Sequence, residues 1–290
     1  HIGIEPALYA HLKAKKNKIN SLNNYFNKKT QNYLISNFGL FDLIYSANTI
    51  GHIDNIRNTL KLISDLLNNK GYFIFENISC YELLQNINFD QLYDEHTYTL
   101  SFTAVNNLCK KFKLNLFNIE KTNIQGGSLR FYITKDLKVP KSSNFYYYRR
   151  KETNFIRKNP FNIFKNKTQI ILKNFKFNLN YLNKKNVDVY GFGASAKATF
   201  LINSLKLSNH NIKKFLDNSE YKIGKYLPGT NIEIINEILI KNISNSIIIL
   251  FAWNHYEEIL KKHRNILKNN NIKLYKSSDF FNYDIFSKKI

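Results

Sequence analysis

Apolar positions along the first half of the chain alternate between short continuous runs and longer stretches with helical spacing. Residues 41–46 and 71–77 are short apolar runs, whereas apolar residues recur at helical spacing from 53 to 67. Strand-like runs that alternate with helical stretches are typical of a parallel sheet with helices packed on it. The pattern therefore predicts an α/β domain.

The flanking segments complete this predicted domain. Residues 1–5 are expected to end a buried strand, and Pro6 is expected to begin a helix that continues to about residue 16. A helix is predicted over 103–112. Residues 114–120 and 129–134 are predicted to form an antiparallel pair of strands.

A change in composition marks the end of the first domain. Residues 137–144 are rich in lysine, proline and serine, which favours a boundary. Residues 145–186 are polar, aromatic and compatible with helix. A second α/β unit follows, with strands predicted at 187–190, 212–216, 246–251 and 272–275 and helices at 196–204 and 256–267. We therefore predict a first domain at 1–138, a helical linker at 139–186 and a second domain at 187–290.

Charge and length narrow the classes of function. The net charge is +22, but lysine and asparagine are spread over all 290 residues and form no stripe with interleaved aromatic residues. A groove for nucleic acid needs such a stripe, so no nucleic-acid partner is expected. The two cysteines, Cys80 and Cys109, are isolated and are expected to be buried thiols. No apolar run approaches the roughly 18 residues of a membrane span, so no membrane partner is expected and the cytoplasm is the predicted location.

Tyr93, Glu95 and His96 belong to the most informative stretch of the sequence, because they set a histidine beside a tyrosine and a carboxylate. Histidine titrates near neutrality and can remove a proton from carbon. A tyrosine hydroxyl can stabilise the oxyanion that then develops, and a carboxylate can orient the imidazole. A loop with an ordinary surface histidine is the alternative interpretation.

Polar residues also stand at the predicted strand ends, where open α/β sheets bind ligands. Glu5 can accept hydrogen bonds from both hydroxyls of a ribose, although Glu-Pro is also a common turn. Asn48 and His52 follow the strand at 41–46. A lone histidine at such a place is more often structural than catalytic.

Two glycine-containing loops could hold an anion. Gly126, Gly127, Ser128 and Arg130 combine close backbone approach with a guanidinium fork, although Gly-Gly also suits a bulged hairpin. The second loop begins after the strand at 187–190. Its residues have the spacing of a dinucleotide fingerprint with an acid at the next strand end, namely Gly191, Gly193, Ala196 and Asp217. Ser195 and Lys197 then lie near a helix N-terminus that could meet a diphosphate, and Asn254 follows the strand at 246–251.

Taken in order, these stretches resemble the family of S-adenosylmethionine (SAM)-dependent sugar C-methyltransferases, which act on nucleotide-linked keto-deoxysugars. The matching stretches cover nearly the whole chain and lie at residues 3–7, 41–48 with His52, 89–96, 126–130, 190–197, 227–230 and 252–254.

The resemblance implies a partial class I methyltransferase Rossmann-like sheet followed by a second Rossmann-like α/β domain that binds the nucleotide-sugar, a dTDP-4-keto-6-deoxysugar. It makes His96 the general base, with Tyr93 and Glu95 assisting and His52 supporting the tyrosine. It places Glu5 and Asn48 against SAM. Both glycine-containing loops and Asn254 are assigned to the substrate, namely Gly126, Gly127, Ser128, Arg130, Gly191, Gly193, Ser195, Lys197 and Asn254.

The resemblance also implies that the chain is N-terminally truncated. In the family the cofactor's glycine loop and a zinc-binding module precede the residue that matches His1, so no metal site is expected in this sequence. Three alternatives remain open: an NAD-dependent oxidoreductase that uses residues 191–196, a non-catalytic remnant and a nucleic-acid-binding protein. The oligomeric state is also open.

Overall fold

A computed structural model describes residues 1–122 and 127–286 and divides the chain into two compact units. Unit 1 comprises His1–Leu83 and Glu95–Lys158, and unit 2 comprises Leu84–Asp94 and the chain from Asn159 onward. Each unit consequently takes residues from two separate segments of the sequence.

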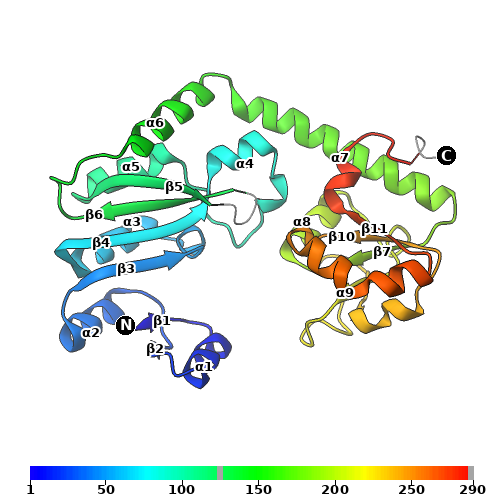
Figure 1. The fold of residues 1–290 in the computed structure, drawn as a ribbon, viewed down its shortest axis with the longest axis horizontal. Coiled ribbons are helices and arrows are strands. Elements are labelled where there is room, and N and C mark those ends of the chain that lie inside the picture. Colours follow the sequence, from blue (N-terminus) through cyan, green and yellow to red (C-terminus); the bar gives the residue numbers. More distant parts are fainter. Residues whose placement is uncertain (123–126, 287–290) are drawn as a thin grey trace. The chain divides into compact units, whose positions relative to one another are not determined.

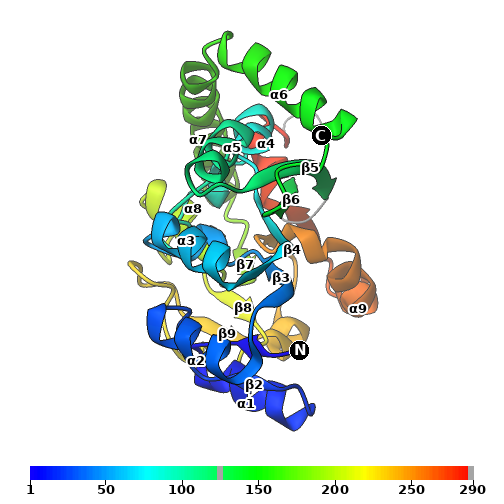
Figure 2. The ribbon, with the colours of Figure 1, turned by 90° about the vertical axis from the view of Figure 1, so that its left-hand side faces the viewer.

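Unit 1 is built on a four-stranded sheet with the order β3-β4-β6-β5, in which β3 and β4 are parallel and β6 runs antiparallel to both of its neighbours. A separate parallel pair, β1–β2, lies with helices α1 and α2 (Figures 1 and 2). The elements are β1 (Gly3–Ile4), α1 (Leu8–Lys16), β2 (Ser21–Leu22), α2 (Lys28–Phe38), β3 (Phe41–Ala47), the 3₁₀ turn η1 (Ile50–His52), α3 (Ile56–Leu66), β4 (Leu67–Ile78), α4 (Cys80–Asn86, which continues into unit 2), α5 (Phe102–Lys111), β5 (Asn115–Thr122), β6 (Ser128–Thr134) and α6 (Ser143–Ile156).

One face of the four-stranded sheet forms the core of unit 1. Phe73, Phe75 and Phe131 are almost fully buried and stack across β4 and β6, with ring centroids about 5 Å apart. Helices α3, α5 and α6 supply the opposing apolar residues. Since side chains alternate across a strand, residues such as Glu76 and Arg130 face the other side of the sheet.

Unit 2 is a five-stranded sheet in which every neighbouring pair is parallel, with the order β11-β10-β7-β8-β9. Counted within the unit this is the doubly wound order 3-2-1-4-5, with the switch point between β7 and β10. The elements are the 3₁₀ turn η2 (Phe89–Gln91), α7 (Pro160–Lys184), β7 (Val189–Phe192), α8 (Ala196–Ser204), β8 (Phe215–Asp217), β9 (Ile234–Asn236), η4 (Glu237–Asn242), β10 (Ile247–Leu250), η5 (Trp253–His255), α9 (Tyr256–Asn269), β11 (Lys273–Lys276) and η6 (Ser277–Phe281).

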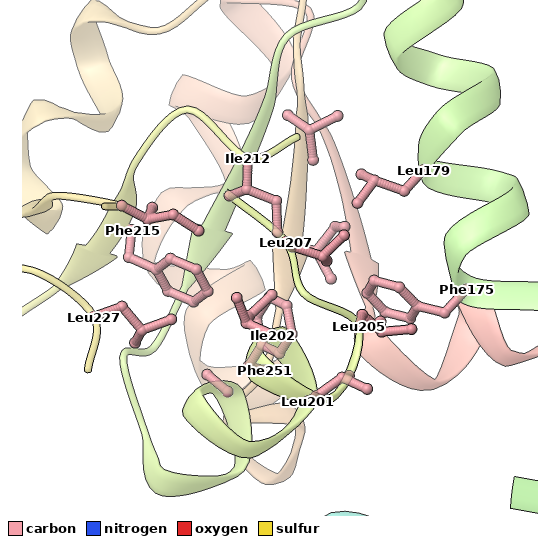
Figure 3. Packing of buried hydrophobic residues seen from close by; sticks show 14 of the residues in the cluster. Phe175, Leu179, Leu201, Ile202, Leu205, Leu207, Ile212, Phe215, Leu227 and Phe251 are labelled. Atoms are coloured by element: carbon pink, nitrogen blue, oxygen red, sulfur yellow. The ribbon is translucent and has the colours of Figure 1, made fainter. Parts of the chain in front are cut away.

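The core of unit 2 joins helix α7 to the sheet through α8. Phe175 and Leu179 of α7 lie beside Leu201 and Ile202 of α8, with Phe215 of β8 on the far side (Figure 3). Four of these side chains are completely buried, and Leu201 is 2% exposed. This packing holds α8 in position. One of the predicted ligand loops lies directly before the first residue of this helix.

Both units are α/β, as predicted, but the domain boundaries differ from the predicted ones. The segment predicted as a linker, 139–186, is divided: α6 packs in unit 1 and α7 packs in unit 2. Residues 84–94 lie in unit 2 although they were assigned to the first domain. Elements α2, α4, β2 and β9 were not predicted, and each is short or carries few buried apolar residues.

Candidate active site and ligand-binding loops

In unit 1 the predicted residues collect at the end of the sheet where β3 and β4 finish. The Asn48 backbone N–H donates to the Glu76 carbonyl at 2.8 Å, and Asn48 has a left-handed backbone with φ of 49°. Its side-chain Oδ1 is buried and has no hydrogen-bond partner among the described residues. Such an orphaned acceptor is suited to a ligand that carries a donor.

The loop that carries His52 is fastened on both sides. The Gly51 N–H donates to Asn77 Oδ1 at 3.1 Å, and the Gly51 carbonyl accepts from the Tyr98 N–H at 3.0 Å. A Cβ at Gly51 would lie 2.6 Å from Asn77 Oδ1, so this position requires glycine. The contacts bring the loop after β3 against the segment that follows His96.

His52 and His96 meet as a result. Their ring centroids are 5.0 Å apart and the rings are inclined by 65°, an edge-to-face contact. His52 is exposed and His96 is half-buried. The structure therefore pairs the predicted base with the second predicted histidine, and it does so in a part of the molecule that a ligand can reach.

Gly127 and Ser128 lie at the same end of the sheet. The Ser79 N–H, just beyond β4, donates to the Gly127 carbonyl at 3.3 Å, and Ser128 is fully buried. Gly127 has φ of +128°, and a Cβ there would lie 2.9 Å from Cβ of Glu82. Gly126, also predicted to contact substrate, lies outside the described residues.

The guanidinium of Arg130 forms an ion pair with a residue of the protein itself. Its Nε and Nη2 lie 3.1 and 2.9 Å from Oε2 of Glu76, a carboxylate that is only 1% exposed at the side chain. The hydrogen bonds that Arg130 donates to Tyr132 and Glu76 raise its pKa. The sequence pattern did not reveal Glu76, because its partner stands on β6, far along the chain.

Glu5 follows a strand, as predicted, but that strand is not buried: β1 is a half-buried strand of two residues that pairs with β2. Glu5 Oε1 accepts a hydrogen bond from the Ala7 N–H at 2.8 Å, and its backbone carbonyl accepts from Asn23 Nδ2 at 2.9 Å. One carboxylate oxygen therefore supports the turn into α1.

The cluster predicted from Tyr93, Glu95 and His96 is divided between the units. Glu95 is exposed and belongs to unit 1 with His96, whereas Tyr93 belongs to unit 2. In unit 2 Tyr93 lines a cavity of about 200 Å³ with residues of the second glycine loop.

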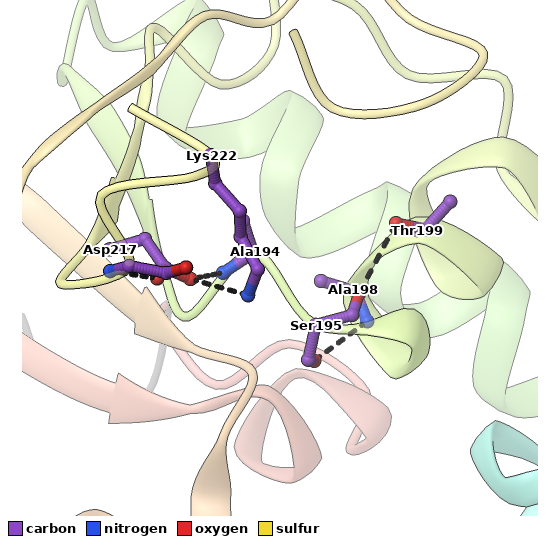
Figure 4. A network of polar contacts seen from close by, with 7 residues as sticks. Ala194, Ser195, Ala198, Thr199, Asp217 and Lys222 are labelled. Atoms are coloured by element: carbon purple, nitrogen blue, oxygen red, sulfur yellow. Dashed lines mark hydrogen bonds and ion pairs between the residues drawn. The ribbon is translucent and has the colours of Figure 1, made fainter. Parts of the chain in front are cut away.

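In that loop Asp217 holds the backbone in place. Asp217 Oδ2 accepts from the Ala194 N–H at 2.8 Å and pairs with Lys222 at 3.2 Å, while Oδ1 accepts from the Ser219 N–H (Figure 4). Gly191 is required because a Cβ would lie 2.5 Å from the Phe215 ring. The acid of the predicted fingerprint is thus engaged within the protein.

The cavity lies at the switch point, after the ends of β7 and β10, and its wall is formed by Tyr93, Ser195, Ala196, Lys197, Ala252 and His255. Ser195 caps α8 by accepting from the Ala198 N–H at 3.3 Å (Figure 4). Lys197 Nζ lies 4.6 Å from the centre of the Trp253 ring, and Trp253 Nε1 donates to Asp90 Oδ2 at 3.3 Å. Asp90 and Trp253 were not predicted as site residues. The side chain of Asn254, a predicted substrate contact, lies outside the described atoms.

The residues that the structure describes contain no group of three or more histidine, cysteine, aspartate or glutamate side chains that could hold a metal ion. Among the same residues, no helix has both the length and the apolar character that crossing a membrane requires.

Two families match the sequence. Residues 123–274 match the family described as C-methyltransferase C-terminal domain, and residues 1–118 match the one described as methyltransferase domain. A curated relative, C-methyltransferase NovU of Streptomyces niveus, is 23% identical over 274 residues, which is 92% of this chain. The chain spans 64% of the length of that relative.

Solved structures that align with part of this chain include two methyltransferases. A SAM-dependent methyltransferase from Thermotoga maritima is 18% identical, with a TM-score of 0.36 over 47% of this chain and 72% of its own. Magnesium protoporphyrin IX methyltransferase from Synechocystis PCC 6803 is 10% identical, with a TM-score of 0.34 over 47% of this chain and 63% of its own.

Proposed function

Because the chain belongs to the C-methyltransferase family, we propose that it methylates a carbon next to the keto group of a nucleotide-linked deoxysugar. The observation that carries this proposal is the contact between His96 and His52 at the ligand edge of the sheet in unit 1. An imidazole at such an edge can serve a reaction that must first remove a proton from carbon.

His96 acts as the general base in this proposal. A hydrogen next to a ketone is only weakly acidic, so its removal needs a positioned base and a group that stabilises the enolate oxygen. The imidazole of His96 takes the proton, and its ring is held in place by the contact with His52. Tyr93 donates a hydrogen bond to the developing oxyanion, and Glu95 orients the base.

SAM is the proposed cofactor, and when bound it supplies an electrophilic methyl group. The residues at the ends of β1 and β3 suit such a ligand. Asn48 offers a buried acceptor without a partner, and Glu5 offers a carboxylate at a strand end. These side chains would hold the cofactor, while Gly127 and Ser128 stand at the neighbouring strand end, on the substrate side of the proposal.

Unit 2 is proposed to bind the nucleotide part of the substrate at its switch-point cavity. An NAD-binding domain would normally leave the acid at the end of its second strand free for a ribose hydroxyl. Here both oxygens of Asp217 accept backbone N–H groups and one also pairs with Lys222. This arrangement disfavours NAD at the cavity, because both oxygens of the acid that would bind its ribose are already engaged within the protein.

Hydrogen exchange at carbon tests the proposed role of His96 independently of methyl transfer. The full chain is mixed with a dTDP-linked 4-keto-6-deoxysugar in D₂O without SAM, and mass spectrometry follows deuterium uptake by the sugar. We expect uptake that falls by about 10²- to 10⁴-fold in His96→Asn, because a positioned base contributes an effect of that size.

His210→Asn is the matched control, since His210 is an exposed histidine in a turn of unit 2. It should exchange at the wild-type rate. His52→Asn should slow exchange less than His96→Asn. Exchange that persists unchanged in His96→Asn would disprove the base assignment, and no exchange by the folded wild-type protein would disprove this substrate class or favour a non-catalytic remnant.

A further inference from the structure

The Lys197 ammonium is held in an unusual environment at the switch-point cavity. Its Nζ is buried and has no hydrogen-bond partner among the described residues, although the side chain lines the cavity. It also stands in the first turn of α8, where the helix dipole is positive and repels a cation. A dehydrated cation in this position is stable only if nearby groups offset the cost.

Two residues from other parts of the chain provide that offset. The indole face of Trp253 lies 4.6 Å from Lys197 Nζ, a cation–π distance. Asp90, which is 9% exposed, accepts the indole N–H at 3.3 Å and fixes the plane of the ring. Burial lowers the pKa of Lys197, and the Asp90 carboxylate opposes that change.

We propose that Asp90 and Trp253 form a positioning pair that stores the Lys197 ammonium on the indole face, and that an incoming diphosphate draws it off the ring. This inference rests on the proposed function, because the diphosphate is that of a nucleotide-linked substrate. The stored ammonium has already lost its water, so the ligand does not have to strip it.

A diphosphate fits the remaining groups of the wall. The first turn of a helix leaves backbone N–H groups without an intrahelical acceptor, and those of α8 begin at this cavity. An anion there gains from the helix dipole and from Lys197 together. Lys197 is therefore the binding residue, and Trp253 and Asp90 act through it.

Trp253 is the only tryptophan in the chain, so its fluorescence reports on this contact. Inorganic pyrophosphate is titrated into the full-length protein, and we expect a saturable change in emission as the ammonium leaves the ring. Lys197→Met should weaken binding by about 10- to 100-fold, the effect of losing one hydrogen bond to a charged group. Lys213→Met is the control, since Lys213 pairs with Asp188 on the surface and should bind as wild type.

Proton uptake on ligand binding shows whether Trp253 and Asp90 position Lys197 or only support the local structure. Besides Lys197, the titratable side chains in the cavity wall are Tyr93 and His255, and the Asp90 carboxylate also acts electrostatically on Lys197. Calorimetry at several pH values, in buffers of different ionisation heat, should show more proton uptake on pyrophosphate binding by the wild type than by Lys197→Arg, because burial lowers the pKa of Lys197 and the anion favours its charged form. Lys197→Arg should bind with only the proton exchange of pyrophosphate itself, since a guanidinium keeps its charge.

The Trp253 variants complete the test, with pyrophosphate binding measured by calorimetry. Trp253→Phe should retain the proton uptake in excess of Lys197→Arg, and Trp253→Leu should lose it because the lysine then reaches solvent. Equal uptake in Trp253→Leu, or no saturable pyrophosphate binding, would overturn the inference. Deuterium exchange without pyrophosphate binding would overturn this inference alone, whereas pyrophosphate binding without exchange would overturn the proposed reaction.

Discussion

At the scale of single residues, the partner of a charged side chain decides what that side chain is available to do. Arg130 forms two contacts with Oε2 of Glu76, and Glu76 is almost completely buried. A buried carboxylate without its cation is costly, since desolvation is no longer offset. The ion pair with Glu76 is therefore sufficient to explain why an arginine stands at position 130. An experiment can separate this structural role from a contact with the substrate.

We expect Arg130→Met to destabilise the protein by about 2–3 kcal/mol, somewhat less than for a fully buried pair because Arg130 is one-third exposed. Urea unfolding followed by circular dichroism measures this loss. The double variant Glu76→Gln with Arg130→Met should recover most of the stability, because no charge is left unpaired.

The exposed pair Lys213–Asp188 is the reference, and Asp188→Asn should cost less than about 1 kcal/mol. If Arg130→Met is as stable as wild type, the buried ion pair does not contribute to the free energy of unfolding. If the stable double variant fails to exchange deuterium into the sugar while the Glu76→Gln single variant still exchanges, Arg130 contacts the substrate.

At the scale of elements, helix α6 stabilises α5 from a distance in the sequence. Glu152 of α6 is buried, and its two oxygens accept the backbone N–H groups of Phe102 and Thr103 at 2.7 and 3.0 Å. A carboxylate at this place also interacts favourably with the positive end of the α5 dipole. The segment predicted as a linker is therefore part of the architecture of unit 1.

Glu152→Ala should destabilise unit 1 by about 2–3 kcal/mol, because two N–H groups lose a charged acceptor in a buried place. Chemical denaturation followed by circular dichroism tests this expectation. Glu258→Ala serves as the control, since Glu258 is an exposed residue of α9 and its loss should change stability by less than about 0.5 kcal/mol. Equal stability of the two variants would refute the capping role.

Elements with strong local signals were predicted well. The helix at 196–204 has the observed bounds of α8, and the strand at 41–46 ends one residue short of β3. Helix α2 was missed because Leu34 is its only buried apolar side chain, which leaves almost no helical stripe to detect. Strand β9 has three residues, too few to show an alternation.

Residues of the candidate site could likewise be predicted only where a local sequence motif contains them. Lys197, Gly193 and His96 could be singled out because each stands in a local motif. The Trp253–Asp90 contact joins residues 163 positions apart, so no local pattern contains it. Glu76 was hidden for the same reason, since a buried carboxylate in a strand is understood only once its cross-strand neighbour is known.

At the scale of the whole molecule, sequence order and spatial units do not coincide. The family membership that the ordered motifs predicted is confirmed by matches over residues 1–118 and 123–274. The sequence could not predict that residues 84–94 belong to unit 2, because no change in composition marks the ends of that segment.

Phe89 allows this arrangement to be tested. It is 2% exposed and packs in the core of unit 2, with ring contacts to Phe200 and Phe281. Phe89→Ala should therefore destabilise unit 2 by about 3–5 kcal/mol. Trp253 lies in unit 2, so its fluorescence during urea unfolding measures the shift directly.

The comparison variant is Phe131→Ala, which removes a fully buried ring from the core of unit 1. It should shift the unfolding seen by circular dichroism more than that seen by tryptophan fluorescence. A Phe89→Ala protein with an unchanged fluorescence midpoint would show that residues 84–94 add nothing to unit 2.

The interleaving of the two units also has a consequence for synthesis on the ribosome. Chains fold from the N-terminus as they emerge, but Phe89 has no core to enter until the residues beyond Asn159 have been made. During that interval the apolar side chains of this segment (residues 84–94) are exposed to water. The Phe89 neighbours Asn86, Asn88 and Asp90 are polar, so the segment that has to wait in water is only partly apolar.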